Sequence, residues 1–362
     1  MVTRMTANKP RFYDWERTLS YDADVTFVIG PRGIGKTFGI RVQCIRDYIK
    51  RGYRFVEVCR YKNEISGVAD GYFEKLAELD EFSGYMFKSD NRYGYISTAI
   101  DPDSKEKPDW KKICYFVALS EFQRMKKHTF VNVKRIIFDE AILDRSDRYH
   151  RYLPNEYVIL SSIVDSTSRE RSDTDCIKPR VYLLGNACDL ANPYFAHYKV
   201  GSDIGYGYRW YDSKTFLLHM VNDADYSRQK ASGTVAGRML AGTAAGNENI
   251  YNKFSDVSEA YVERKTKNAK YKFAIIYKHK TYSVWVDLSI GRYYICDWYP
   301  RGMESTVYYL TTDDMDVNYM AASRVSEVLK SIDGMYYAGL IYYDTIDVKR
   351  GFLEVLALFG IR

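Results

Sequence analysis

Short apolar runs alternate with longer amphipathic segments along the first half of the chain. Residues 25–29 form an apolar, β-branched run that is typical of a buried strand. Residues 38–51 contain no proline and one glycine, and they predict a helix. Two more apolar runs, 134–138 and 180–184, predict strands that lead into polar residues. This alternation indicates an α/β domain.

Residues 154–171 predict an amphipathic helix, because apolar side chains recur at helical spacing from Leu160 to Val164. The segment ends with Arg169 and Arg171. Two interpretations stay open at this point. The arginines can simply complement the dipole at the end of the helix. Alternatively, one of them can reach the nucleotide site of a neighbouring subunit in a ring.

The second half of the chain has a different pattern. Small residues between 231 and 247 predict a flexible linker region, which we place at 201–249. Three short strands then follow at 271–277, 281–287 and 292–297, and a helix is expected over 314–332. We therefore predict a first domain over residues 1–200 and a second, RNase-H-like α+β domain over residues 250–362.

The composition limits the class of protein to which this chain can belong. Hydrophobic residues make up 46% of the chain and charged residues 28%, as in an ordinary globular protein. No apolar run approaches the roughly 18 to 20 residues of a membrane span, and we expect neither a signal peptide nor a membrane partner. The six cysteines lack metal-ligand spacing, which favours reduced thiols in a cytoplasmic protein. The net charge of +6 permits a polyanionic partner without requiring one.

A complete GxxxxGK[ST] motif lies between the first predicted strand and helix. This strand–turn–helix context separates a phosphate-binding loop from a chance glycine turn. Backbone N–H groups of the loop would bind phosphate oxygens, Lys36 would reach the β- and γ-phosphates, and the Thr37 hydroxyl would bind Mg²⁺. The predicted nucleotide-binding residues of the loop are Gly30, Pro31, Arg32, Gly33, Ile34, Gly35, Lys36 and Thr37.

Acidic and amide residues follow the two later strands. Asp139 and Glu140 end the run at 134–138, which has the form of a Walker B segment. Asp139 would hold Mg²⁺, and Glu140 would polarise the attacking water. Asn186 follows the run at 180–184 and is our candidate sensor of the γ-phosphate, although Gly-Asn is also a common turn dipeptide.

The order of these motifs resembles a known family, the DNA encapsidation ATPases of small tailed phages with protein-primed linear genomes (Picovirinae type). The resemblance covers roughly residues 19–330. It includes FVIGPRGIGKT, VEVCRYK, RIIFDE, YLPNE and LLGNACDLANPYF, and it continues in YSVWVDLSIGRYYICD and YYLTTDD. It implies a terminase-like P-loop ATPase of the additional-strand, catalytic-glutamate type. It also implies a homomeric ring, a pentamer, that acts on the portal (connector) protein of a procapsid in the host cytoplasm.

Carried over residue by residue, the resemblance places Lys36 and Thr37 in the nucleotide site, Asp139 on Mg²⁺ and Glu140 as catalytic carboxylate. It also implies that Arg169 is the trans-acting arginine, counted from Leu-Pro-Asn-Glu at 153–156. Lys126 aligns with a second basic residue at the subunit interface, although its neighbour Lys127 makes this assignment uncertain by one position. The chain departs from the pattern at 101–112 and at 172–178.

We expect no nuclease activity from the second domain. A two-metal nuclease needs acids from several strands, and the strand at 271–277 carries none. Five cations lie within residues 264–272. They form either a solvated turn or a contact with DNA or with a structural packaging RNA.

The sequence therefore predicts an ATP-driven translocase that packages double-stranded DNA into a procapsid. ATP is chosen over GTP because the resemblance favours it. Two other readings stay open: a helicase-like ATPase that remodels nucleic acid, and an assembly protein that uses the nucleotide as a switch.

Overall fold

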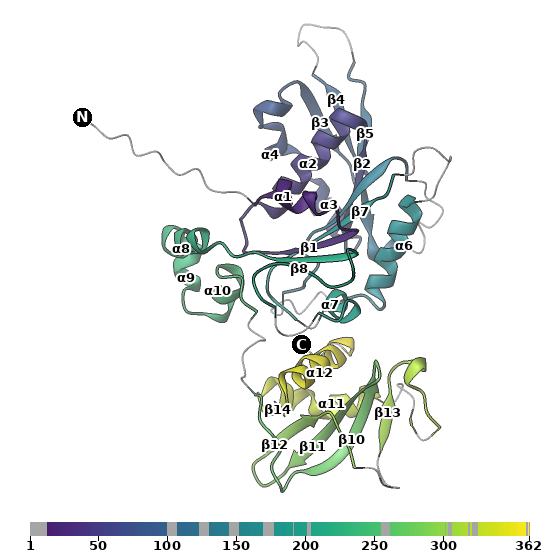
Figure 1. Cartoon of the computed structure of the whole chain (residues 1–362), viewed down its shortest axis with the longest axis vertical. Helices are drawn as coiled ribbons and strands as arrows, with labels where there is room; N and C mark the ends of the chain where they lie inside the picture. The colour runs from purple at the N-terminus through teal and green to yellow at the C-terminus, as the bar shows by residue number, and fades with distance from the viewer. Residues whose placement is uncertain are drawn as a thin grey trace, which may run out of the picture.

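The computed structural model contains two β-sheets in separate parts of the chain, with short helices between them (Figure 1). The structure describes residues 13–99, 107–122, 130–144, 152–168, 177–190, 192–200, 204–254, 261–300, 302, 306–317, 319–320, 325–359 and 361. No helix within these ranges is long and apolar enough to span a membrane.

The first sheet has nine strands in the order β3-β4-β5-β2-β6-β7-β1-β9-β8. Its six central strands are parallel, and antiparallel strands extend it at both edges. Strand β7 lies between β1 and β6, the two strands that lead into the predicted Walker segments. This inserted strand confirms the predicted additional-strand arrangement. The strands are β1 (Val25–Ile29), β2 (Arg54–Cys59), β3 (Tyr85–Ser89), β4 (Tyr93–Thr98), β5 (Lys111–Ala118), β6 (Val133–Phe138), β7 (Arg180–Gly185), β8 (Gly207–Trp210) and β9 (Phe216–Met220).

Helices cover both faces of this sheet, because its central strands are apolar on both sides. Phe27 and Val28 are adjacent in β1, yet they belong to two different hydrophobic cores. One core contains Ile40 of α2, and the other contains Leu160 and Ile163 of α6. The apolar residues that recur at helical spacing in α6 thus face the core, as the sequence predicts. The helices of this part are α1 (Trp15–Ser20), α2 (Lys36–Arg51), α3 (Glu64–Ala69), α4 (Glu74–Ala77), α6 (Glu156–Ser168) and α7 (Pro193–His197).

The linker predicted over 201–249 was wrong for the described part of that segment. Strands β8 and β9 belong to the first sheet, and three short helices follow them: α8 (Ala224–Gly233), α9 (Val235–Leu240) and α10 (Ala244–Asn249). The small residues allow close packing rather than flexibility. A Cβ atom on Gly237 would lie 1.9 Å from the carbonyl oxygen of Lys230, and one on Gly246 would lie 2.1 Å from that of Leu240.

The second sheet has five strands in the order β13-β10-β11-β12-β14. Strands β10 (Lys270–Tyr277), β11 (Lys280–Asp287) and β12 (Arg292–Cys296) form the antiparallel meander that the sequence predicts. Parallel strands β13 (Val307–Tyr309) and β14 (Ile341–Tyr343) extend its two edges. Helices α11 (Val325–Tyr337) and α12 (Ile346–Leu358) share a hydrophobic core with these strands.

The helix predicted over 314–332 is displaced along the chain. Residues Thr312–Asp314 form only a short 3₁₀ helix, η4, and α11 is described from Val325 onward. The Asp314 carboxylate accepts hydrogen bonds from the backbone N–H groups of Lys278 and His279, at 2.9 and 2.8 Å. Asp314 therefore fixes the β10–β11 turn instead of starting a helix.

The packing between α8 and α9 predicts opposite effects for two glycine substitutions. Gly237→Ala should destabilise the protein by about 1–3 kcal/mol, because the new methyl group meets backbone atoms that cannot move aside. Gly233→Ala is the matched control, since nothing lies within 4 Å of its added Cβ. It should be neutral or stabilising by up to about 1 kcal/mol. Urea midpoints followed by circular dichroism test this, and equal midpoints would contradict the packing described here.

Candidate phosphate-binding and catalytic site

The phosphate-binding loop runs from the end of β1 to the start of α2. Gly33 and Gly35 have φ values of 86° and 87°, a left-handed conformation that L side chains rarely adopt. Lys36, the first residue of α2, is buried with 7% of its surface exposed. Its Nζ donates to the carbonyl oxygens of Gly30 at 2.7 Å and Pro31 at 3.1 Å. Burial lowers the pKa of Lys36 to about 8.

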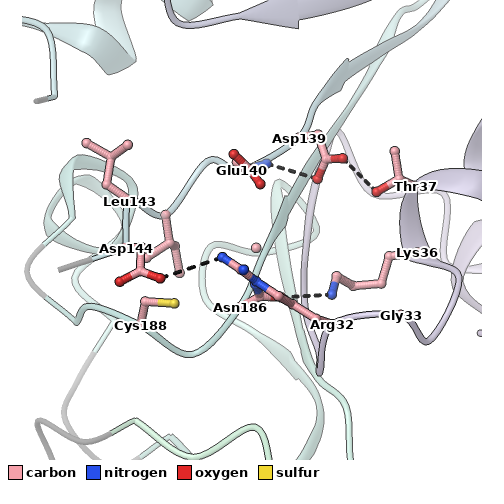
Figure 2. A pocket seen from close by; sticks show the side chains of 12 residues that line it. Arg32, Gly33, Lys36, Thr37, Asp139, Glu140, Leu143, Asp144, Asn186 and Cys188 are labelled. Carbon is pink, nitrogen blue, oxygen red and sulfur yellow. Dashed lines mark hydrogen bonds and ion pairs between the residues drawn. The ribbon is translucent and has the colours of Figure 1, made fainter. Parts of the chain in front are cut away.

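The two Walker segments meet at the carboxyl end of the parallel strands. The hydroxyl of Thr37 donates to Asp139 Oδ2 at 2.6 Å. Directly after the inserted strand β7, Asn186 Oδ1 accepts a hydrogen bond from Lys36 Nζ at 3.2 Å. The structure therefore brings together an ammonium, a hydroxyl, a carboxylate and an amide from three strand ends (Figure 2).

Glu140 follows directly after Asp139 in an unusual backbone conformation. Its φ of 52° lies in the left-handed region, and its N–H donates to Asp139 Oδ1 at 2.9 Å. Desolvation and the nearby charge of Asp139 raise the pKa of the Glu140 carboxyl group. A raised pKa brings a carboxylate closer to the range in which a general base works well near neutral pH.

These groups line one cavity of about 450 Å³. Arg32 extends into it and forms an ion pair with Asp144 at 3.6 Å (Figure 2). Four of the predicted loop residues do not line it: Gly30, Pro31, Ile34 and Gly35. Ile34 is buried in the core beside α2, and Gly30 and Pro31 supply the carbonyl oxygens that Lys36 contacts. The lining residues are Arg32, Gly33, Lys36, Thr37, Asp139, Glu140, Ile142, Leu143, Asp144, Gly185, Asn186 and Cys188.

A buried ion pair supports the Walker B turn, and sequence analysis did not assign it a role. Arg60 Nε donates to Glu156 Oε2 at 2.9 Å, and both side chains are almost completely buried. Its guanidinium also donates to the backbone carbonyls of Glu140 and Ala141, at 3.3 and 3.0 Å. Tyr194 donates to the second oxygen of Glu156 at 2.7 Å.

These three residues come from three pieces of the family resemblance. Arg60 belongs to VEVCRYK, Glu156 to YLPNE and Tyr194 to NPYF. The pieces lie far apart in the sequence, and the fold joins them in a single hydrogen-bonded network. The motif pieces marked these three residues in the sequence, and only the fold shows that they contact one another.

The helices after β9 contact the phosphate-binding loop from the other side. The carbonyl oxygen of Arg32 accepts from Tyr226 Oη at 2.8 Å and also from Lys230 Nζ. The N–H of Arg32 donates to the carbonyl oxygen of Asn249 at 3.2 Å. Helix α8 and the end of α10 therefore hold the backbone of the loop in place.

Two predicted residues, Arg169 and Lys126, lie outside the described residues. Helix α6 is described as far as Ser168. Most of the two segments in which the chain departs from the family pattern, 101–112 and 172–178, lies outside them as well.

Acidic residues of the second sheet are engaged in turns. Asp287 accepts from Ser289 and from the hydroxyl of Thr266, and these hydrogen bonds lower its pKa. Asp314 binds the β10–β11 turn as described above. Among the described residues, no group of three or more His, Cys, Asp or Glu side chains is placed to hold a metal ion.

Comparisons with known proteins give consistent matches over almost the whole chain. The model of the Podovirus DNA encapsidation protein (Gp16) family matches residues 7–356. The DNA packaging protein of Bacillus phage phi29 is 32% identical over 339 residues, which cover 93% of this chain and 94% of that protein. The DNA packaging protein of Bacillus phage B103 is also 32% identical, over 84% of this chain and 87% of its own length.

A solved structure agrees with these matches. A chain in the bacteriophage Phi-29 viral genome packaging motor assembly superimposes with a TM-score of 0.64 at 30% identity. The superposition covers 97% of this chain and 99% of that one.

The buried ion pair predicts a large loss of stability when one partner is removed. Arg60→Met should lower the free energy of unfolding by about 3–5 kcal/mol, because Glu156 is left buried without its counter-charge. The control is Arg46→Met in the exposed pair between Arg46 and Glu81, where the expected loss is about 0–1 kcal/mol. Denaturant titrations of both variants measure the difference, and similar losses would show that the buried pair has no special role.

Proposed function

The chain belongs to the Podovirus DNA encapsidation protein (Gp16) family, and on this basis we propose that it is an ATP-driven translocase that packages a double-stranded viral genome into a procapsid through the portal. The observation that supports ATP hydrolysis is the hydrogen bond from Thr37 of the phosphate-binding loop to Asp139 of the Walker B segment, with Glu140 next to it. A site that only bound nucleotide would not need that second carboxylate.

ATP and Mg²⁺ fit the donors at this site. The ammonium of Lys36 would bind the β- and γ-phosphates, with the loop N–H groups from Gly30 to Thr37 around them. Mg²⁺ prefers oxygen ligands, and the hydroxyl of Thr37 and the carboxylate of Asp139 supply them. When bound, the ion neutralises charge on the phosphates.

The remaining groups have distinct roles in hydrolysis. Glu140 would accept a proton from the attacking water, which its raised pKa favours. Asn186 contacts Lys36 directly, so its amide is positioned to respond to the γ-phosphate. Arg60 touches no nucleotide group in this scheme; it positions Glu140 through the backbone carbonyls.

The ring belongs to the proposal as well. We infer a homopentamer in which Arg169 of one subunit acts on the nucleotide of its neighbour, with Lys126 at the same interface. Helix α6 leads towards Arg169, and its first turn is fixed to the Walker B turn by Glu156. The partners would be double-stranded DNA and the portal protein, in the host cytoplasm during transient attachment to the procapsid.

The second domain would bind nucleic acid rather than cut it. Its meander begins without an acid in β10, and Asp287 and Asp314 are engaged in turns. Lys265, in the basic run at 264–272, lies 4.4 Å from the ring centre of Trp285. Lys265 also lies 5.5 Å from the ring centre of Trp298, which is exposed, and a cation beside an exposed aromatic ring suits DNA or a structural packaging RNA.

Two substitutions test the enzymatic proposal. Lys36→Ala should abolish nucleotide binding, whereas Glu140→Gln should bind ATP normally and hydrolyse it about 10²- to 10⁴-fold more slowly. Glu81→Gln, which changes an exposed carboxylate beside Arg46, is the control and should behave as wild type. Binding is measured with a fluorescent ATP analogue and turnover by phosphate release. Near-normal turnover by Glu140→Gln would remove Glu140 from the mechanism.

A mixing experiment tests cooperation between subunits. Arg169→Ala and Glu140→Gln subunits should each be nearly inactive in DNA-stimulated hydrolysis. Mixed rings contain interfaces where an intact arginine faces an intact glutamate, so some hydrolysis should return. If rings assemble and no mixture recovers activity, Arg169 serves its own subunit or only the fold.

A further inference from the structure

A second cavity, of about 430 Å³, lies where the two domains meet. One wall comes from α7 and the residues beside it, and the other from α12 and the β10–β11 hairpin (Figure 1). None of its lining residues belongs to the nucleotide site. Those that matter below are Lys199 of the first domain and Lys278, Lys280, Arg350 and Glu354 of the second.

The cations of this cavity outnumber the acids available to pair with them. Glu354 is already engaged, because it accepts hydrogen bonds from Tyr277 at 3.0 Å and from Lys278. Within the described residues, Lys199, Lys280 and Arg350 form no hydrogen bond or ion pair with a protein group. Three cationic side chains from both domains therefore line one cavity without a hydrogen-bonded counter-charge, and Asp347 is the other acid of the lining.

Arg350 is the most constrained of the three. It is partly buried, and burial lowers its pKa more than the surrounding Asp347, Glu354, Tyr211 and Asp189 raise it. A guanidinium that loses water without gaining a hydrogen-bonded anion is costly to the folded state. Its planar guanidinium can donate to two oxygens of one phosphate group at once, whereas a lysine ammonium acts as a point charge without that geometric preference.

The helices that carry these cations, or lie next to them, are held in place by buried contacts. Asn192 is fully buried, and its side chain caps α7 through the Phe195 N–H at 2.9 Å and donates to the Asp189 carbonyl at 3.0 Å. On the other side, a Cβ atom on Gly351 would lie 2.0 Å from the hydroxyl of Tyr282. Glycine at this position thus allows α12 to approach β11 beside Arg350.

We propose that this interdomain cavity is a phosphate-binding site, in which Arg350 and Lys280 of the second domain and Lys199 of the first bind one phosphate group together. The bound group would hold the two domains in a fixed relative position. Its source is either a free phosphate anion or the backbone of a nucleic-acid strand. The proposal does not rest on the proposed ATPase activity, since it uses none of the residues of that site.

The test uses the full chain with Lys36→Ala, so that the nucleotide site does not contribute. Binding of inorganic phosphate is measured by equilibrium dialysis, and binding of a short DNA duplex by fluorescence anisotropy at several salt concentrations. Arg350→Gln and Lys280→Gln are compared with Lys330→Gln, an exposed lysine on α11 outside the cavity. Lys280 is itself exposed, so its variant stays informative if Arg350→Gln fails to fold.

We expect both cavity variants to weaken binding about tenfold or more, with the Lys330→Gln control within about twofold of the parent. Loss of phosphate binding alone identifies a free anion as the ligand. Weaker DNA binding, with a salt slope reduced by about one, identifies the nucleic-acid backbone. If the cavity variants and the control bind both probes equally, the proposal is wrong, whatever the ATPase assays show.

Discussion

The buried pair between Arg60 and Glu156 is the contact on which the carboxyl edge of the first sheet depends. Two buried charges are tolerated only when their hydrogen-bonding capacity is met, and here it is. The guanidinium binds Glu156 and two backbone carbonyls, and Glu156 also accepts from Tyr194 and from the Leu153 N–H. These bonds fix β2, the Walker B turn, α6 and α7 relative to one another.

That constraint matters because the site itself is built from loops. The parallel strands end at one edge of the sheet, and the chemistry lies in the residues just beyond them. Glu140 keeps a left-handed backbone conformation there, a cost that its surroundings must offset. Hydrogen bonds to its carbonyl and from its N–H supply that support.

The segment between the two sheets attaches to the same site. Tyr226 and Lys230 of α8 bind the carbonyl of Arg32, and Asn252 donates to the carbonyls of Ile29 and Val221, each at 2.9 Å. Residues 226–252 are therefore hydrogen-bonded to the phosphate-binding loop and to the end of β1. The glycines of this segment serve packing, which explains why a composition typical of linkers folds into helices.

The sequence by itself determined the features set by local pattern. These are the β1–loop–α2 unit, the acids after β6, the apolar face of α6 and the meander of the second domain. Only the tertiary structure decided what depends on partners far apart in the chain. Gly237 looks like a linker residue until the Lys230 carbonyl packs against it, and Asp314 looks like a helix start until the β10–β11 turn binds it. Arg60 and Glu156 are 96 residues apart, so no local pattern could pair them.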